Sequence, residues 1–402
     1  MEVKVLSQPI DSNNVTLALG SELATLLDSR NPFYREIWLI SAFADYQSIV
    51  RLRDHIQRSL NDQAQVHMIV GVDLQSTSVE ALEAILTLGT DAKVVKNKRP
   101  GHTFHPKIYL FESDGSAVLI IGSNNLTEGG MFKNYEGSVM IKYNRGEESA
   151  EYNQVKAALA PFLNPSQSIV QPLSVELIET LAARGDVLRE HQRREIRKQA
   201  RRSARAQTGV PASPFGSEPI PPPPPLPAEF LRRVARAVER GRVGDTKLPE
   251  VTAFYMHLNR LQGTNIPGEA RIPLAAREIA KRFWGWPNRY VLDTQRRGTH
   301  PRRYHNWKPK WLIFEADAPQ RTYFDEVRMY EYEDSADFRF YSRRLVTLGA
   351  DSMDIVRITR LGRSEGAEFE CVLARRGTQI HREWERYCTV PIPNSPRRFG
   401  FA

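Results

Sequence analysis

The 402-residue sequence has few cysteines, no long apolar run and no nucleotide-binding loop. Cys371 and Cys388 lie in one half without CxxC or metal-ligand spacing, so we expect free thiols in a reducing compartment, not disulfides or a metal site. No apolar run approaches the roughly 18 residues of a membrane span, and the N-terminus lacks a secretory signal pattern. No GxxxxGK[ST] motif occurs. These absences predict a cytoplasmic protein without membrane anchor, cofactor or metal.

The charge and the length point to a two-domain protein with a polyanionic partner. The chain has 56 Lys and Arg against 47 Asp and Glu, a net charge of +9, and it is too long for one ordinary core. Residues 187–207 are dense in arginine, and residues 211–227 contain PIPPPPPLP, a polyproline-type spacer. We predict a first domain at residues 1–186, a basic and proline-rich linker at 187–248, and a second domain at 249–402.

The first half alternates between strand-like and helix-like segments. Glu36–Ala44 has the apolar density of a buried strand, and Asp45–Leu60 places apolar residues on one helix face. Further strands are predicted at Gln65–Val72, Ala92–Val95 and Gly137–Tyr143, and further helices at Ser78–Leu88, Glu148–Phe162 and Ser174–Arg184. The alternation predicts an α/β fold, a mixed and mainly parallel sheet with helices on both faces.

The second half is rich in short strands. Strands are predicted at Trp311–Glu315, Glu326–Tyr332, Ile355–Arg360 and Glu368–Leu373, with one helix at Ala275–Phe283. This pattern indicates a β-barrel-like domain with a covering helix. The fold class is therefore α/β plus β.

The stretch from Gly101 to Glu136 carries the residues with the clearest chemistry. His105 and Lys107 open a strand-like run, and residues two apart in a strand project from the same face. A second apolar run leads into the turn Gly122-Ser123-Asn124-Asn125, whose Asn125 reaches the same place if the two strands are neighbours. An imidazole, an ammonium and an amide together suit a phosphodiester. An HxK pair alone is also compatible with a chance histidine on a surface strand.

HxK followed by GSxN resembles the phospholipase D superfamily, whose members cut phosphodiesters through a covalent phosphohistidine, usually without metal. The resemblance assigns catalysis to His105, Lys107, Ser123 and Asn125, and suggests that Glu136 contacts the His105 ring; an ordinary strand-end carboxylate is the alternative. The family's acidic position is Glu112 here instead of Asp, and the gap to GSxN is longer than usual, which leaves the role of Glu112 open.

Only one copy of the motif is present, whereas the family normally builds its site from two. The other HxK-like segment, His300 to Arg303, lacks both the lysine and a following GSxN. The resemblance then implies a homodimer with a shared site, in which one imidazole attacks phosphorus and the other protonates the leaving oxygen.

A second resemblance covers most of the last seventy residues. DFRFYSRRLVTLGADSMDIVRITRLG, RRGTQIH and RRFGF resemble the C-terminal domain of BfiI-type restriction endonucleases, a B3-like DNA-recognition pseudobarrel. That domain holds DNA with two arms, which would lie near residues 260–271 and 339–344. The candidate DNA-binding residues are Arg260, Gln262, Asn265, Arg271, Arg339, Ser342, Arg343 and Arg344. Solvent-facing charges on strand edges are the alternative.

Together the resemblances predict a dimeric, metal-independent restriction-type endonuclease whose partner is double-stranded DNA. Three alternatives stay open: the nuclease subunit of an ATP-dependent complex with a separate ATPase-helicase, a lipid phosphodiesterase, and a DNA-binding protein with a decayed nuclease.

Overall fold

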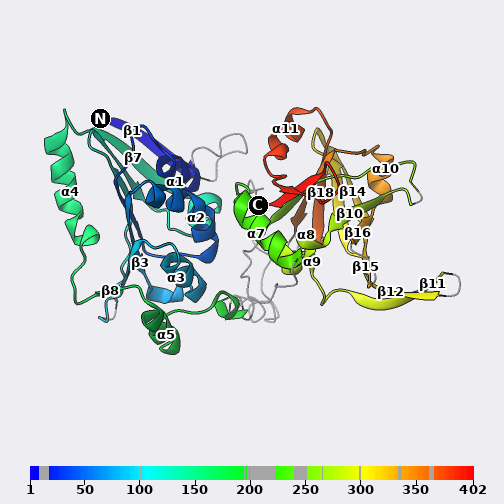
Figure 1. The fold of residues 1–402 in the computed structure, drawn as a ribbon, viewed down its shortest axis with the longest axis horizontal. Helices are drawn as coiled ribbons and strands as arrows, with labels where there is room; N and C mark the ends of the chain where they lie inside the picture. The colour runs from blue at the N-terminus through cyan, green and yellow to red at the C-terminus, as the bar shows by residue number, and fades with distance from the viewer. Residues whose placement is uncertain are drawn as a thin grey trace, which may run out of the picture. The chain divides into compact units, whose positions relative to one another are not determined.

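A computed structural model describes residues 1–8, 18–99, 101–193, 195, 196, 199, 223–239, 251–264, 266–297, 300–333, 337–361 and 366–402. The chain divides into two compact units, Met1–Pro221 and Pro222–Ala402 (Figure 1). Much of the predicted linker, together with Asn265, lies outside the described residues, and the linker boundaries remain a prediction. Within the described part, no helix combines the length and apolarity needed to cross a membrane.

The first unit is built on one mixed sheet. Its strands lie in the order β1 (Glu2–Gln8), β7 (Glu136–Asn144), β6 (Ser116–Gly122), β5 (Lys107–Glu112), β2 (Glu36–Ser41), β3 (Gln65–Gly71), β4 (Asp91–Val95) and β8 (Val170–Pro172). Only β2–β3 and β3–β4 pair in parallel, and the other neighbours are antiparallel. The prediction of a mainly parallel sheet is therefore wrong. Three residues join β5 to β6, and so short a connection permits only an antiparallel pair.

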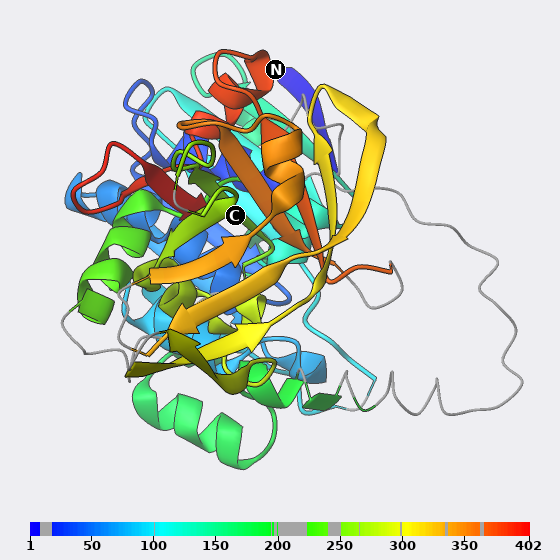
Figure 2. The same ribbon diagram turned by 90° about the vertical axis from the view of Figure 1, so that its right-hand side faces the viewer.

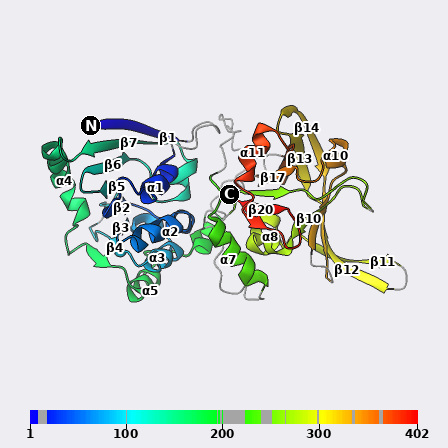
Figure 3. The same ribbon diagram turned by 45° about the horizontal axis from the view of Figure 1, so that its top comes forward.

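Helices cover both faces of this sheet, as the alternation predicts (Figures 1 and 3). They are α1 (Leu19–Leu27), α2 (Tyr46–Asn61), α3 (Val79–Leu86), α4 (Ser149–Leu163) and α5 (Val175–Ala183). Helices α1, α2, α3 and α5 contribute to one apolar core, and α4 packs into a second core on the opposite face. Asp45, Ser78 and Ser174 cap α2, α3 and α5 by accepting a backbone N–H, which explains where these helices begin.

The second unit contains two sheets. One has the order β10 (Glu269–Pro273), β16 (Asp337–Tyr341), β15 (Arg328–Tyr332), β12 (His300–Trp307) and β11 (Val291–Arg297). The other has the order β14 (Ala318–Glu326), β13 (Lys310–Glu315), β18 (Phe369–Ala374), β17 (Ile355–Arg360), β9 (Ala253–His257), β20 (Arg398–Phe401) and β19 (Val390–Pro391) (Figure 2). Neither sheet closes into a barrel among the described strands, so the B3-like pseudobarrel remains a proposal.

Four helices of at least five residues accompany these sheets: α7 (Ala228–Glu239), α8 (Leu274–Ile279), α10 (Arg343–Thr347) and α11 (Gln379–Glu385). The helix predicted at Ala275–Phe283 is interrupted at Ala280 and continues as α9 (Lys281–Trp284). Helix α7 falls in the predicted linker, yet Phe230, Leu231 and Val234 are buried, so this helix belongs to the packed part of the second unit. Trp284 and Trp311 are fully buried, as expected for core residues.

Candidate active site

The candidate catalytic residues come together at one end of three neighbouring strands. Ser41 of β2 pairs with Lys107 of β5, and Ile108 pairs with Ile121, the residue before Gly122. His105 therefore precedes β5, and the turn Ser123–Asn125 follows β6, at the same end of these two strands. The neighbouring-strand arrangement on which the predicted site depends is confirmed.

His105 is exposed, and its ring is bordered by Lys107 and Phe43. Lys107 Nζ lies 2.7 Å from Nδ1 and 3.0 Å from Nε2 of the ring, and donates to the His105 carbonyl oxygen at 2.9 Å. Phe43 packs edge-on against the ring, with centroids 5.6 Å apart. The segment is fixed by hydrogen bonds from Phe104 N to Asp73 Oδ2 (2.9 Å) and from Ala42 N to the carbonyl oxygen preceding Lys107 (2.8 Å).

The electrostatics of this pair favour an uncharged imidazole. Partial burial, and then the positive charge of Lys107, lower the pKa of His105 below its ordinary value. Burial also lowers the pKa of Lys107, whereas the carboxylate of Glu136 acts in the opposite direction. An uncharged imidazole has a lone pair for attack on phosphorus, so the surroundings suit a nucleophile.

The turn that carries Asn125 is held rigidly. Asn125 Oδ1 lies 3.3 Å from Ser41 Oγ and shares its proton with the nearer Phe43 carbonyl oxygen, at 2.7 Å. The backbone carbonyl of Asn124 accepts a hydrogen bond from the Tyr109 hydroxyl at 2.8 Å. Gly130 is required here, because a Cβ at this position would lie 2.5 Å from the Asn125 carbonyl oxygen. Among the described residues, none accepts a hydrogen bond from Asn125 Nδ2, so the amide can donate to a phosphate oxygen.

Glu136 does not contact His105, contrary to the prediction. Its carboxylate instead accepts hydrogen bonds from the Ser123 hydroxyl and from Asn134 Nδ2, the latter at 3.2 Å. The reason is local: Gly137 N donates to Ser123 Oγ at 3.1 Å, which brings the turn onto the first residues of β7. Glu136 therefore contacts Ser123, and its charge opposes the effect of burial, which lowers the pKa of Lys107.

Glu112 lies at the opposite end of β5 and is buried. Its carboxylate accepts a hydrogen bond from the Tyr152 hydroxyl. Lys156 Nζ donates to Oε1 at 2.9 Å and to Oε2 at 2.7 Å, and both partners lie on α4. It lies five positions after Lys107 along the strand, a distance of roughly 17 Å. Glu112 thus ties α4 to the sheet and lies away from the candidate catalytic residues of this chain.

Comparison with known families agrees with this geometry. Residues 27–157, which include every candidate catalytic residue, match the family described as "Cardiolipin synthase, PLD-like domain". The first unit contains a phospholipase D-like domain. Among curated proteins, none matches the sequence significantly.

Several solved structures resemble part of the chain at low identity. NucT from Helicobacter pylori is 15% identical, with a TM-score of 0.29, over 40% of this chain and 95% of its own. The phospholipase D family member Nuc from Salmonella typhimurium is 17% identical, with a TM-score of 0.27, over 39% and 92%. Yeast tyrosyl-DNA phosphodiesterase 1, as an H432R mutant, is 10% identical, with a TM-score of 0.25, over 40% and 39%. The assignment of the PLD-like domain rests on the family match and the site geometry.

The candidate DNA-binding residues of the second unit differ in their exposure and in their ion-pair partners. Arg260, Gln262 and Arg343 are exposed. Arg271 and Arg339 are paired across β10 and β16, and both face Glu269, at 3.6 and 3.3 Å. Ser342 is buried and caps α10, and Arg344 is paired with Asp325 at 3.0 Å. All remain predictions as DNA contacts.

Some supporting residues are visible only in the folded chain. Ser41 and Phe43 lie beside the site and contact Asn125 and His105 themselves. Tyr109 was not singled out from the sequence, although its position two residues after Lys107 places it on the same strand face.

Proposed function

We propose that this chain is a DNA endonuclease whose PLD-like domain cuts phosphodiesters through a phosphohistidine. The observation that carries the proposal is the contact between Lys107 Nζ and the His105 imidazole. This contact lies at the same end of the strands as the Asn125 amide. The group supplies a nucleophile, a fixed positive charge and a neutral donor for the developing charge on the phosphoryl oxygens.

The proposed reaction has two steps. A nitrogen of the uncharged His105 imidazole forms a bond to phosphorus, and the bond from phosphorus to the leaving oxygen breaks. A protonated imidazole from a second chain gives its proton to that oxygen and then, as a base, takes a proton from water. The water oxygen bonds to phosphorus while the phosphorus–nitrogen bond breaks, which regenerates both imidazoles. Lys107 and Asn125 hold the phosphoryl oxygens throughout.

An exposed apolar strip supports a homodimer as the source of the second imidazole. Val5, Val139 and Ile121 are paired neighbours on β1, β7 and β6, and their side chains project from one face of the sheet. They are 64%, 37% and 40% exposed, and Val139 and Ile121 lie on interior strands, where apolar residues are ordinarily covered. Ile121 directly precedes the turn of the site. A second copy packed here would cover the strip and bring a second His105 within reach.

Mixing experiments test the shared site. Chains carrying His105→Ala, unfolded and refolded with an excess of wild-type chains, should produce mixed dimers without cleavage activity, so activity should fall faster than the wild-type fraction. Val139→Asp should convert the dimer to a monomer in sedimentation and abolish cleavage at the same time. A fully active monomer would refute the shared site.

DNA is favoured as the substrate by the net charge of +9 and by the resemblance of the second unit to a B3-like domain. In this proposal the second unit selects the sequence through exposed side chains such as Arg260, Gln262 and Arg343, and Asn265 is a further candidate. Cleavage of plasmid DNA should persist in EDTA, because the proposed chemistry uses imidazole and ammonium groups. Sequencing the cut ends would give the recognition site.

A lipid phosphodiester is the second candidate, since the matching family is described by the name of cardiolipin synthase. Parallel assays on duplex DNA and on phosphatidylcholine or cardiolipin vesicles distinguish the two. Turnover of lipid without cleavage of DNA would overturn the nuclease proposal. If DNA is cut only in cell extract with ATP, a pull-down should recover a separate ATPase-helicase chain.

A further inference from the structure

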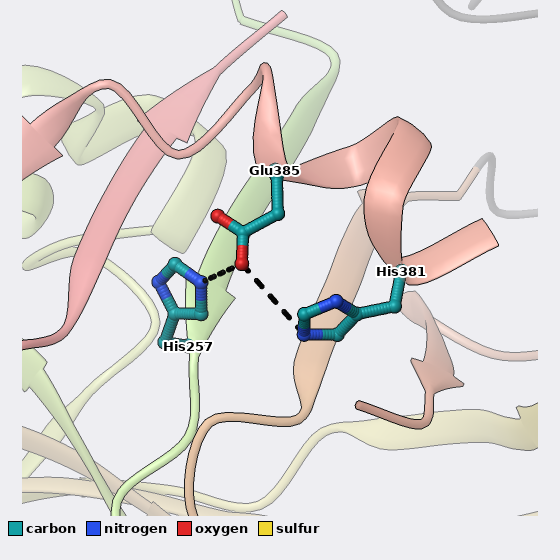
Figure 4. A group of neighbouring side chains, drawn as sticks. All are labelled: His257, His381 and Glu385. Carbon is teal, nitrogen blue, oxygen red and sulfur yellow. Dashed lines mark hydrogen bonds and ion pairs between the residues drawn. The ribbon is translucent and has the colours of Figure 1, made fainter. Parts of the chain in front are cut away.

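A compact group of two histidines and one glutamate lies in the second unit, far along the sequence from the candidate active site. Figure 4 shows the His257 ring, at the end of β9, and the His381 ring, on α11, both directed toward Glu385 at the end of α11. Both histidines are buried, with exposed fractions of 1% and 6%, whereas Glu385 is accessible. The possible ligand atoms all lie within 4.8 Å of one another.

The distances within the group fit a common centre. Glu385 Oε1 lies 3.0 Å from His257 Nε2 and 3.9 Å from His381 Nε2. Ligands bound at 2.0–2.1 Å to a tetrahedral zinc ion are about 3.4 Å apart, between these two values. Without metal, the carbonyl oxygen of Met353 accepts a hydrogen bond from His381 Nε2 at 2.9 Å, which holds this ring beside Glu385. Met353 adopts a φ of 69°, a conformation that non-glycine residues rarely take and that directs this carbonyl.

We propose that His257, His381 and Glu385 bind one divalent transition-metal ion, zinc by ligand chemistry, and that this ion ties α11 to β9. Two imidazoles and a carboxylate are a ligand set typical of zinc. The site is separate from the PLD-like domain and does not depend on the nuclease proposal.

The surroundings of His257 can support both the metal-bound and the metal-free group. Without metal, Nε2 donates to Glu385, and Nδ1 accepts from the backbone N of Arg398 at 3.1 Å. With metal, the ring proton moves to Nδ1 and is donated to the carbonyl oxygen of Arg398, 3.2 Å away, which leaves the Nε2 lone pair for the ion. Such a backbone partner for the second ring nitrogen is the usual support of a ligating histidine.

The sequence did not reveal this group because His257 and Glu385 are 128 residues apart. His381 and Glu385 are four apart on one helix face, a spacing that is a weak signal by itself. The two histidines come together at one carboxylate only when β9 and α11 pack against each other in the folded chain.

The experiment uses the untagged full-length chain, stripped of metal and titrated with Zn²⁺ alone by calorimetry, with native mass spectrometry for stoichiometry. We expect one ion per chain and a rise in the unfolding temperature of the second unit. Co²⁺ in place of Zn²⁺ should give the visible absorption of a nitrogen- and oxygen-ligated ion. Absence of one-to-one binding would overturn the proposal and leave a hydrogen-bonded cluster.

Matched variants locate the ion. Glu385→Gln should weaken Zn²⁺ at least about 100-fold, since even the loss of an outer partner typically costs 10- to 100-fold. Glu383→Gln, an exposed position on the same helix, should bind as the wild type does. His381→Gln, which keeps a donor for Met353, removes a second ligand independently. Wild-type affinity in the Glu385 and His381 variants, or loss of binding in His105→Ala, would refute the site.

Discussion

At one end of β5, Lys107 Nζ lies against the exposed imidazole of His105, whereas at the other end the carboxylate of Glu112 is buried beneath α4. The His105 imidazole is accessible and has a lowered pKa. The Glu112 carboxylate is paired with the Lys156 ammonium and accepts a hydrogen bond from a tyrosine hydroxyl. One strand therefore separates residues suited to chemistry from a residue that maintains the fold. Substitutions at the two ends should fail in different ways.

The largest effect is expected at His105. His105→Ala removes the nucleophile and should lower single-turnover DNA cleavage by at least about 10⁴-fold, as for other covalent catalysts, with little change in thermal stability because the ring is exposed. DNA binding should be retained. His102→Ala, an exposed histidine in the same loop, is the control and should cut normally. Cleavage by His105→Ala would disprove the assignment.

Lys107→Gln should have the next largest effect. Losing one charge-stabilising donor typically lowers the rate by about 10²- to 10³-fold, and the loss should appear in single-turnover cleavage. Lys142→Gln, on β7 and paired with exposed Glu2, should leave the rate within a few-fold of wild type. An equal effect of the two substitutions would show that Lys107 acts through net charge alone.

Glu112→Gln should change stability and spare chemistry. It leaves a buried amide opposite Lys156 and Tyr152, so urea denaturation should show a loss of about 1–3 kcal/mol in the free energy of unfolding of the first unit. Asp114→Asn, whose pair with Arg35 is exposed, should cost about 0–1 kcal/mol. A folded Glu112→Gln protein that no longer cuts DNA would place this residue in the catalytic group after all.

The smallest expected effect is a displacement of the pH profile. The nucleophile must be uncharged, so cleavage should fall as pH falls through the pKa of His105, which lies below the ordinary histidine value of about 6.5. The imidazole of the second chain must be protonated to act as the acid, so cleavage should also fall as pH rises above this pKa, and the profile should be bell-shaped. Lys107→Gln removes one cause of the lowered pKa and should move the midpoint upward; a midpoint that moves down would contradict the pairing.

The sequence predicted the elements of the first unit well, because each has a local pattern. Apolar density in Glu36–Ala44 and the helical stripe of Asp45–Leu60 depend on neighbours along the chain, and both elements form close to the predicted bounds. Strand direction was mispredicted because it depends on connections: the short link between β5 and β6 makes that pair antiparallel. In the second unit, only β13, β15, β17 and β18 were predicted among the described strands. The division into two sheets was not predicted, since pairing joins residues distant in sequence.

The residues of the candidate site could be predicted from local motifs, whereas their contacts could not. HxK and the GSxN turn are local motifs, and the folded chain brings them to one edge. The partners of Glu136 and Glu112 could not be predicted from the sequence, because packing determines both. Ser123 and Asn134 lie nearer to Glu136 than the imidazole does. The partners of Glu112 lie on α4, which follows β7 in the chain.

The hydroxyl of Ser41 has a consequence for how natural variants of this chain should be interpreted. It donates to the carbonyl oxygen of Phe43 at 2.7 Å and accepts from Leu126 N at 2.9 Å. It therefore connects the loop of Phe43, beside the imidazole, to the loop that contains Asn125. A change as mild as Ser41→Ala would release both walls together. An allele altered only there would look harmless in a residue-by-residue comparison, yet would misalign His105 and Asn125.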